Sequence, residues 1–213
     1  MTIPSIAIVG NADIDPVHGP AIDACDIVIR FNDCRSFGPG GLKTDIVAVC
    51  NTGRPGERMT QGPDWRINPA VKAASDIWCV RDGAFFAAMR QGLMATHPEL
   101  DDFCDDHTSG FLDIALDTGK TVHIIPPATH EETVTRLIAF DPEPYVVPSS
   151  GLIVIIEAMR LYPVSPIRIA GFGHQGWEWH PFAAERRLVD HLVATGRLAR
   201  LDPQIAARQA EGA

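Results

Sequence analysis

Short runs of apolar, mostly β-branched residues recur along the chain, and longer mixed segments separate them. Each run spans four or five residues, which is the length of a short strand. Runs without alternating polar positions are typical of strands covered on both faces, as in a parallel sheet. The sequence therefore predicts a mostly parallel sheet, with strands at residues 6–9, 27–31, 46–50, 77–80, 122–125 and 167–171.

The segments between these runs are long enough for crossover helices. Residues 84–94, 111–117 and 131–140 fit that role, so strands and helices alternate as in layered α/β proteins with right-handed crossovers. The length of 213 residues suits one domain with one substantial core. We therefore expect a single α/β domain over residues 1–213, Rossmann-like, with fraying of residues 204–213.

The last third of the chain contains a more specific helix pattern. Residues 181–195 place Leu188 and Leu192 on one face, with Pro181 suited to the first helical position and Gly196 to the end. The preceding apolar stretch, residues 152–161, is apolar on almost every side. Periodicity leaves both a helix and a strand open for that stretch.

Composition and charge exclude some classes of function. Hydrophobic residues make up 46% and charged residues 21%, which is ordinary for a folded globular protein. The net charge of -9 argues against a general nucleic-acid binder, because such proteins need a basic face to displace phosphate counterions. A single nucleotide is still compatible with this charge, since a few main-chain donors can hold one phosphate.

Five cysteines are scattered along the chain, without any C-x-x-C pair. Disulfide frameworks and cysteine-rich zinc sites need paired cysteines, so neither is indicated. The first five residues run straight into an apolar strand without the basic flank of a secretory signal. No apolar run is long enough to span a bilayer. These features predict a soluble protein of a reducing, cytoplasmic compartment.

Two predicted strands end in polar residues at the sheet edge where open α/β folds bind ligands. The first continues into Gly10-Asn11, a sharp turn whose amide can both donate and accept hydrogen bonds. The second delivers Arg30-Phe31-Asn32, which offers a cation, an aromatic face and an amide. A tight turn and the polar end of an edge strand are the alternatives. No G-x-G-x-x-G motif supports a dinucleotide site.

The segment Pro148-Ser149-Ser150-Gly151 precedes the apolar stretch. If that stretch is a helix, two hydroxyls and several free main-chain N–H groups converge there. Such an arrangement binds phosphate without a metal, using the orphan donors and the helix dipole. An ordinary N-cap is the alternative, because serine is common at that position.

Residues 171–181 combine glycines with two tryptophans and two histidines, an unusual density for a connecting loop. His180 directly precedes the predicted helix, where the positive end of the helix dipole disfavours protonation of the imidazole. The segment therefore predicts a neutral histidine that can accept a proton.

A metal site is the weaker alternative. Asp13-Ile14-Asp15 spells the D-x-D pair that holds manganese or magnesium in many sugar-nucleotide enzymes. It follows the first strand too closely for that role. His174 and His180 lack a third ligand at a sensible spacing. We expect no required metal, and a metal-dependent hydrolase built on these aspartates is the third hypothesis.

In this order, the segments resemble glycosyltransferase family 29, the sialyltransferases. Residues 6–51 are similar to the long sialylmotif, which opens with Val-Gly-Asn. Residues 147–173 resemble the short motif, with Pro-Ser-Ser-Gly in place of Pro-Ser-Thr-Gly. His180 and Glu185 match the very short motif, a histidine and a glutamate separated by four residues. Residues 53–143 carry none of the resemblance.

The resemblance implies a metal-free variant of the GT-A fold and no cofactor. It implies inverting transfer of sialic acid, or a related acidic sugar such as Kdo, from a CMP-sugar to a glycan or small saccharide. His180 would be the general base, with His174 as a further catalytic candidate. The donor nucleotide would be held by Gly10, Asn11, Arg30, Asn32, Ser149, Ser150 and Gly151, with support from Gly173, Trp177, Trp179 and Glu185.

The chain also departs from that family. Its cysteines do not match the disulfide positions, and Gly176-Trp177-Glu178-Trp179 occupies the place of a third motif that normally supplies its own histidine. The alternative is therefore a catalytically inactive, nucleotide-binding accessory protein on the same fold, of the type found in urease operons. It predicts nucleotide binding without consumption of a donor. Neither hypothesis involves nucleic acid or a membrane span.

Overall fold

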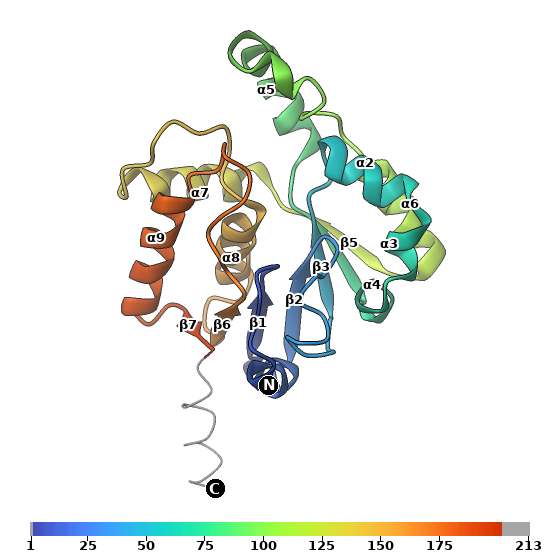
Figure 1. Ribbon diagram of the computed structural model, residues 1–213, viewed down its shortest axis with the longest axis vertical. Helices are drawn as coiled ribbons and strands as arrows, with labels where there is room; N and C mark the ends of the chain where they lie inside the picture. Colours follow the sequence, from blue (N-terminus) through green and yellow to red (C-terminus); the bar gives the residue numbers. More distant parts are fainter. Residues whose placement is uncertain (1, 202–213) are drawn as a thin grey trace, which may run out of the picture.

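Seven parallel strands form one sheet in the order β5-β4-β3-β2-β1-β6-β7 (Figure 1). The computed structural model describes residues 2–201 and confirms the predicted single-domain α/β fold. The expected fraying of residues 204–213 lies outside the described residues. The strands are β1 (Ile6–Val9), β2 (Ile27–Phe31), β3 (Ile46–Val49), β4 (Asp76–Cys79), β5 (Thr121–Ile124), β6 (Ile167–Ala170) and β7 (Ala199–Arg200).

The strand order reverses at β1, which lies between β2 and β6. From β1 the chain steps outward through β2, β3 and β4 to β5, and it then returns to pair β6 with the other side of β1. Ile6 is in register with Ile27 on one side and with Ile167 on the other. Open α/β sheets bind ligands at such a switch point, beyond the carboxyl ends of the strands.

Three helices cover one face of the sheet: α7 (Pro127–Ile138), α8 (Ser150–Leu161) and α9 (Phe182–Ala194) (Figure 1). Their apolar residues join Ile8, Ile29 and Trp78 of the sheet in the largest buried cluster. Residues 152–161, for which the sequence left both a helix and a strand open, belong to the helix α8. Residues 152–159 are all buried, so this helix lacks the polar stripe that would have marked it in the sequence.

The other face is covered by α1 (Gly19–Asp23), α2 (Gly53–Gln61), α3 (Pro63–Ile67), α4 (Pro69–Ala73) and α6 (Thr108–Thr118). Val47 and Ile77 of the sheet pack there against Trp65 and Phe111, whose rings meet edge to face. Since helices lie on both faces, the strands are buried on both sides, which explains their unbroken apolar runs.

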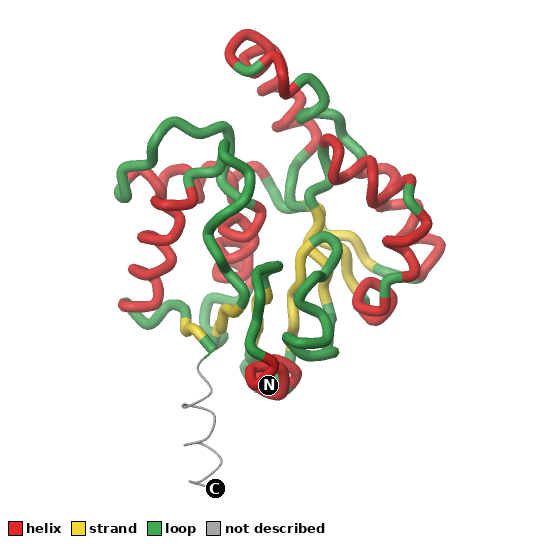
Figure 2. Tube along the Cα trace, in the orientation of Figure 1, coloured by secondary structure: helices red, strands yellow, loops and turns green. Residues whose placement is uncertain are grey.

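A third group of residues stands beyond the carboxyl edge of the sheet. α5 (Gly83–Thr96) follows β4 and leads to the short helix η2 (Pro98–Leu100), apart from the helices that cover the sheet (Figures 1 and 2). Phe86 and Phe103 form a small buried cluster there, against which Trp177 packs. Through Trp177 the loop before α9 is joined to this region.

Two details differ from the sequence expectations. Pro181 is the residue before α9 and not its first helical residue, whereas Gly196 ends the helix in the left-handed conformation that favours glycine. The two-residue strand β7 was not predicted, because both of its residues are exposed. Within residues 2–201, no helix is long and apolar enough to cross a membrane.

Candidate functional site

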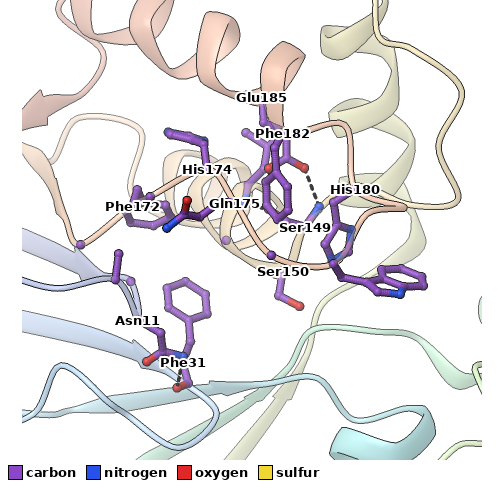
Figure 3. A pocket seen from close by; sticks show the side chains of 18 of the residues that line it. Asn11, Phe31, Ser149, Ser150, Phe172, His174, Gln175, His180, Phe182 and Glu185 are labelled. Carbon is purple, nitrogen blue, oxygen red and sulfur yellow. Dashed lines mark hydrogen bonds between the residues drawn. The ribbon is translucent and has the colours of Figure 1, made fainter.

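The main cavity lies at the carboxyl ends of β1, β2 and β6, at the switch point of the sheet, and its volume is about 840 Å³. Its walls come from the turns after these three strands, the start of α8 and the loop before α9 (Figure 3). A volume of this size suits a ligand as large as a mononucleotide. The residues expected at the site that do line the cavity are Gly10, Asn11, Asn32, Ser149, Ser150, Gly151, Gly173, His174, Trp177, His180 and Glu185.

Asn11 joins two of the turns that form the cavity. Its Nδ2 donates to the carbonyl of Phe31 at 3.1 Å, and its Oδ1 accepts from the N–H of Arg35 at 3.0 Å. Asn32 is held in a left-handed conformation (φ 49°), and its Oδ1 accepts from the N–H of Cys50. Both asparagines therefore shape the floor of the cavity, and each keeps an amide N–H available to a ligand.

Arg30 does not reach the cavity, contrary to the sequence expectation. Its side chain is fully buried and donates to the carbonyls of Lys43, Gly40 and Gly41 and to the hydroxyls of Thr44 and Ser36. The guanidinium is thus the centre of a hydrogen-bonded loop over residues 36–44. Its role is structural because its donors are already committed.

Ser149 is also committed within the protein. It is the N-cap of α8, its Oγ donates to Glu185 at 2.6 Å, and its N–H donates to the other oxygen of the same carboxylate at 2.6 Å. Burial raises the pKa of Glu185, and the two bonds from Ser149 oppose that rise. Glu185 therefore positions the start of α8, as Figure 3 shows, and Ser149 is not a free phosphate donor.

The free donors at α8 belong to the next two residues. The hydroxyl and N–H of Ser150 and the N–H of Gly151 have no acceptor within residues 2–201, and both residues line the cavity. A Cβ at Gly151 would lie 2.9 Å from the ring of Phe172, so glycine lets that ring close against the helix start. This end of α8 offers orphan donors and the positive end of a dipole to an anion.

His180 is a neutral acceptor at the opposite wall. Its Nδ1–H donates to the carbonyl of Val147 at 2.8 Å, which leaves Nε2 without a proton. Burial lowers the pKa of His180 to about 4, the bond to Val147 opposes this, and the charge of Arg81 adds to it. Rings of Trp177 and Phe182 meet the imidazole edge to face. The predicted neutral state is supported, with burial as its main cause.

A His180→Gln substitution is expected to flatten the dependence of stability on acid pH. The folded protein favours neutral His180, whose pKa is about 4 against an ordinary 6.5. The stability that the neutral imidazole supports is therefore present above pH 6.5 and is lost as the pH falls from 6.5 to 4, by roughly 3 kcal/mol. Urea unfolding at several pH values measures this slope. His191→Gln, at an exposed position of α9, is the control, and an equal loss of slope in both variants would contradict the assignment.

The remaining predicted residues of the loop have different places. His174 lines the cavity with φ 46°, but its Nε2 is buried and has no hydrogen-bond partner within the described chain. Burial lowers the pKa of this histidine as well. Trp179 does not line the cavity and packs edge to face on His97. Trp177 stacks on Phe103, so both tryptophans anchor the loop to the region of α5 and η2.

The structure also adds cavity residues that the sequence did not indicate. Arg35 is exposed and is the only arginine or lysine among the lining residues of the described chain. Phe172 meets Phe31 edge to face, with ring centres 6.1 Å apart, and Gln175 and Phe182 complete the wall (Figure 3). Phe172 and Gln175 belong to the segment 171–181 that the sequence singled out, but nothing in the sequence marks their side chains, or those of Arg35 and Phe182, as site residues.

The D-x-D pair does not form a metal site. Asp15 caps the short helix η1 (Pro16–His18) by accepting from the N–H of Val17. Asp13 lines the main cavity, and Asp15 does not. Across residues 2–201, no three His, Cys, Asp or Glu side chains are placed to hold a metal ion. The five cysteines are free and buried. Independence from metal stays a prediction.

Comparison with solved structures supports the fold. A crystal structure of a mammalian sialyltransferase matches 93% of this chain and 68% of its own chain, with a TM-score of 0.55 and 16% identity. The structure of a mammalian sialyltransferase in complex with Gal-beta-1-3GalNAc-ortho-nitrophenol gives a TM-score of 0.53 at 15% identity and covers 94% of this chain and 70% of its own. At such identities the likeness concerns the fold alone. No family model matches the sequence.

Comparison with known proteins corrects the functional prediction. The urease operon 23 kDa accessory protein of Rhizobium meliloti (strain 1021) is 52% identical over 210 residues, which cover 98% of this chain and 97% of that protein. The predicted membership of glycosyltransferase family 29, and with it the prediction of a CMP-sugar-dependent transferase, is therefore wrong. What this chain shares with the sialyltransferases is the fold. The chain belongs to the family of the urease operon 23 kDa accessory protein.

Proposed function

We propose that this chain is a nucleotide-binding accessory protein of a urease operon, which holds a nucleoside monophosphate in the main cavity without transferring a sugar. The accessory role rests on the relative with 52% identity along nearly the whole chain. The proposal that the chain binds a nucleotide is supported by the start of α8, whose free donors line the cavity at the switch point of the sheet. That start of α8 is the observation that carries the proposal.

The phosphate would lie at the start of α8. Ser150 and Gly151 supply two N–H groups and one hydroxyl, and the helix of 12 residues adds its dipole. Arg35 stands at the turn after β2 as the one cation of the lining, and its side chain has no ion pair within residues 2–201. Fixed donors and one exposed cation can hold a phosphate in a protein of net charge -9 without a metal.

The rest of the nucleotide would meet apolar rings and neutral polar groups. Phe31 and Phe172 offer aromatic surface for a base, and the amides of Asn11 and Asn32 keep donors free for its oxygen atoms. The unprotonated Nε2 of His180 can accept a hydrogen bond from a ribose hydroxyl. Cytidine monophosphate is the probe that tests this arrangement.

Calorimetric titration with cytidine monophosphate, with and without a chelator, tests the proposal. We expect binding that does not depend on metal, and a loss of about tenfold in affinity for Ser150→Ala, because one charge-assisted hydrogen bond is removed. Ser109→Ala, at an exposed position of α6, is the matched control and should bind as the unchanged chain does. No heat of binding at millimolar nucleotide, or equal affinities for both variants, would contradict the proposed site.

The absence of turnover needs its own measurement. A CMP-sugar incubated with the protein and varied saccharide acceptors should be recovered intact, and consumption of the donor would overturn this part of the proposal. A strain that lacks the chain, complemented with the unchanged chain or with Ser150→Ala, relates the cavity to urease activity. Equal urease activity with both chains would mean that the accessory role does not depend on nucleotide binding in the cavity.

A further inference from the structure

Arg81 is a buried arginine without a counter-ion. It follows β4 at the carboxyl edge of the sheet, and the residue is only 5% exposed. Its guanidinium carbon lies 4.9 Å from the ring centre of Phe86 and 4.4 Å from that of Phe103. Only Nη1 has a partner, the hydroxyl of Thr52 at 2.6 Å, and no carboxylate within residues 2–201 forms an ion pair with it. Four of its five donors are therefore unused.

Two carboxylates that could have paired with Arg81 have other partners. Asp82, the next residue, caps α5 by accepting from the N–H of Phe85, and Asp106, before α6, accepts from the N–H and the hydroxyl of Thr108. The two aromatic rings stabilise the guanidinium in part, but they supply no acceptor. A nearly buried guanidinium without an anion carries an uncompensated charge, and its unpaired nitrogens are not fully shut off from solvent, so an anion can reach them.

The main chain around Arg81 holds the guanidinium in place before any anion arrives. Asn51 is fully buried; its Oδ1 accepts from the N–H of Arg81 at 2.8 Å and its Nδ2 donates to the carbonyl of Arg81 at 2.7 Å. The same Nδ2 also donates to the hydroxyl of Thr108. Since both backbone groups of Arg81 are fixed, the side chain leaves the sheet edge from a rigid base.

Arg81 also lies close to the main cavity without lining it. The ring of Phe103, on which the guanidinium lies, stacks on Trp177 with centres 5.4 Å apart and planes at 21°. Trp177 in turn lines the cavity. One aromatic layer thus separates the unused donors from the cavity wall.

We propose that Arg81 is the centre of a second, anion-binding site that takes an oxyanion, either a free phosphate or a charged group of a ligand that extends from the main cavity. A guanidinium fork matches the two oxygen atoms of a phosphate or a carboxylate. With a free anion the inference is independent of the proposed nucleotide site, because Arg81 follows β4 whereas the phosphate donors of that site are at the start of α8; with a ligand of the main cavity it rests on the proposed function.

Thermal unfolding in the presence of inorganic phosphate tests this site. Ionic strength is held constant with sodium chloride. We expect phosphate to raise the melting temperature of the unchanged chain in a saturable way, because it binds only the folded state. Arg81→Met should lose this response. Arg186→Met, which removes an exposed arginine of α9, is the matched control and should keep it.

Three outcomes would overturn the proposal. The first is that phosphate causes no saturable rise in the melting temperature of the unchanged chain. The second is that the phosphate concentration at half of the full rise (the midpoint) is the same in Arg81→Met. The third is that Arg81→Met and Arg186→Met lose the response equally. If Arg81→Met does not fold, Arg81→Lys keeps the charge without the fork and should raise the midpoint by about tenfold; an unchanged midpoint would then refute the site. The response should persist in Ser150→Ala, which distinguishes this site from the start of α8.

The two sources of the anion are separated by a second titration. If the site belongs to a ligand of the main cavity, cytidine diphosphate should bind more tightly than cytidine monophosphate, and Arg81→Met should remove the difference. If the site takes a free anion, both nucleotides should bind equally in the presence and absence of phosphate, and the phosphate response alone should depend on Arg81.

Discussion

Arg30→Met is expected to lower the free energy of unfolding by about 4 kcal/mol, the largest effect in this chain. The substitution removes a fully buried guanidinium and the five hydrogen bonds that it donates to residues 36–44. Three of the acceptors are main-chain carbonyls; that of Gly41 keeps the N–H of Gly38, but those of Lys43 and Gly40 would lose the donors of Arg30. Methionine fills much of the volume but satisfies none of them. Urea unfolding followed by circular dichroism measures the loss.

The control for this variant is Arg66→Met, whose arginine is exposed and makes only a 3.7 Å contact with Asp117. Surface pairs of that kind contribute little, so its free energy of unfolding should change by less than about 0.5 kcal/mol. If Arg30→Met changed stability by no more than the control, the loop over residues 36–44 would not depend on the guanidinium. Arg30→Lys should fall between the two, because one ammonium cannot span all five acceptors.

The position of Arg30 explains why its role was predicted wrongly. The sequence shows a cation at the end of a strand, and such cations often serve ligands at the carboxyl edge of a sheet. Its acceptors at Gly40, Gly41 and Lys43 are main-chain carbonyls, which leave no mark in the side-chain sequence. Arg81 presents the opposite case, since it drew no attention in the sequence and is the buried arginine with unused donors.

The sheet could be predicted because its strands are covered on both faces. Helix coverage makes every residue of β1 and β3 buried, so the sequence has an unbroken apolar run at each of them. The helix α2 could not be predicted in the same way. Its sequence is Gly-Arg-Pro-Gly-Glu-Arg-Met-Thr-Gln, and only Met59 and two glycines are buried, so no apolar stripe marks it.

The site was predicted in part for a physical reason as well. Strand ends and a helix start occur at fixed places in an open parallel sheet, so Asn11, Ser150 and His180 could be expected at one edge. The commitment of Ser149 to Glu185 depends on a contact across 36 residues. Such a contact is visible only in three dimensions. The same motifs suggested a transferase, but a fold and its cavity do not determine the reaction.

Gly10→Ala is expected to lower the free energy of unfolding by about 3 kcal/mol and to weaken binding in the cavity. Gly10 is the residue after β1, and a Cβ there would lie 2.2 Å from the carbonyl oxygen of Gly171 and 2.8 Å from its carbonyl carbon. Both atoms are main chain, so the turns after β1 and β6 must move apart. These turns are held by the bonds from Gly10 N–H to Ala170 and from Ala12 N–H to Gly171, and the movement would strain both.

Gly92→Ala gives the same change in chemistry with the opposite expected sign. Gly92 lies inside α5, and no atom lies within 4 Å of its added Cβ. Alanine should therefore stabilise the chain there by about 0.5–1 kcal/mol, through its higher helix propensity. Urea unfolding measures both variants, and titration with cytidine monophosphate measures the cavity. Unchanged stability for Gly10→Ala would mean that the two turns can separate freely, and the rigid cavity floor on which the proposed nucleotide site depends would be refuted.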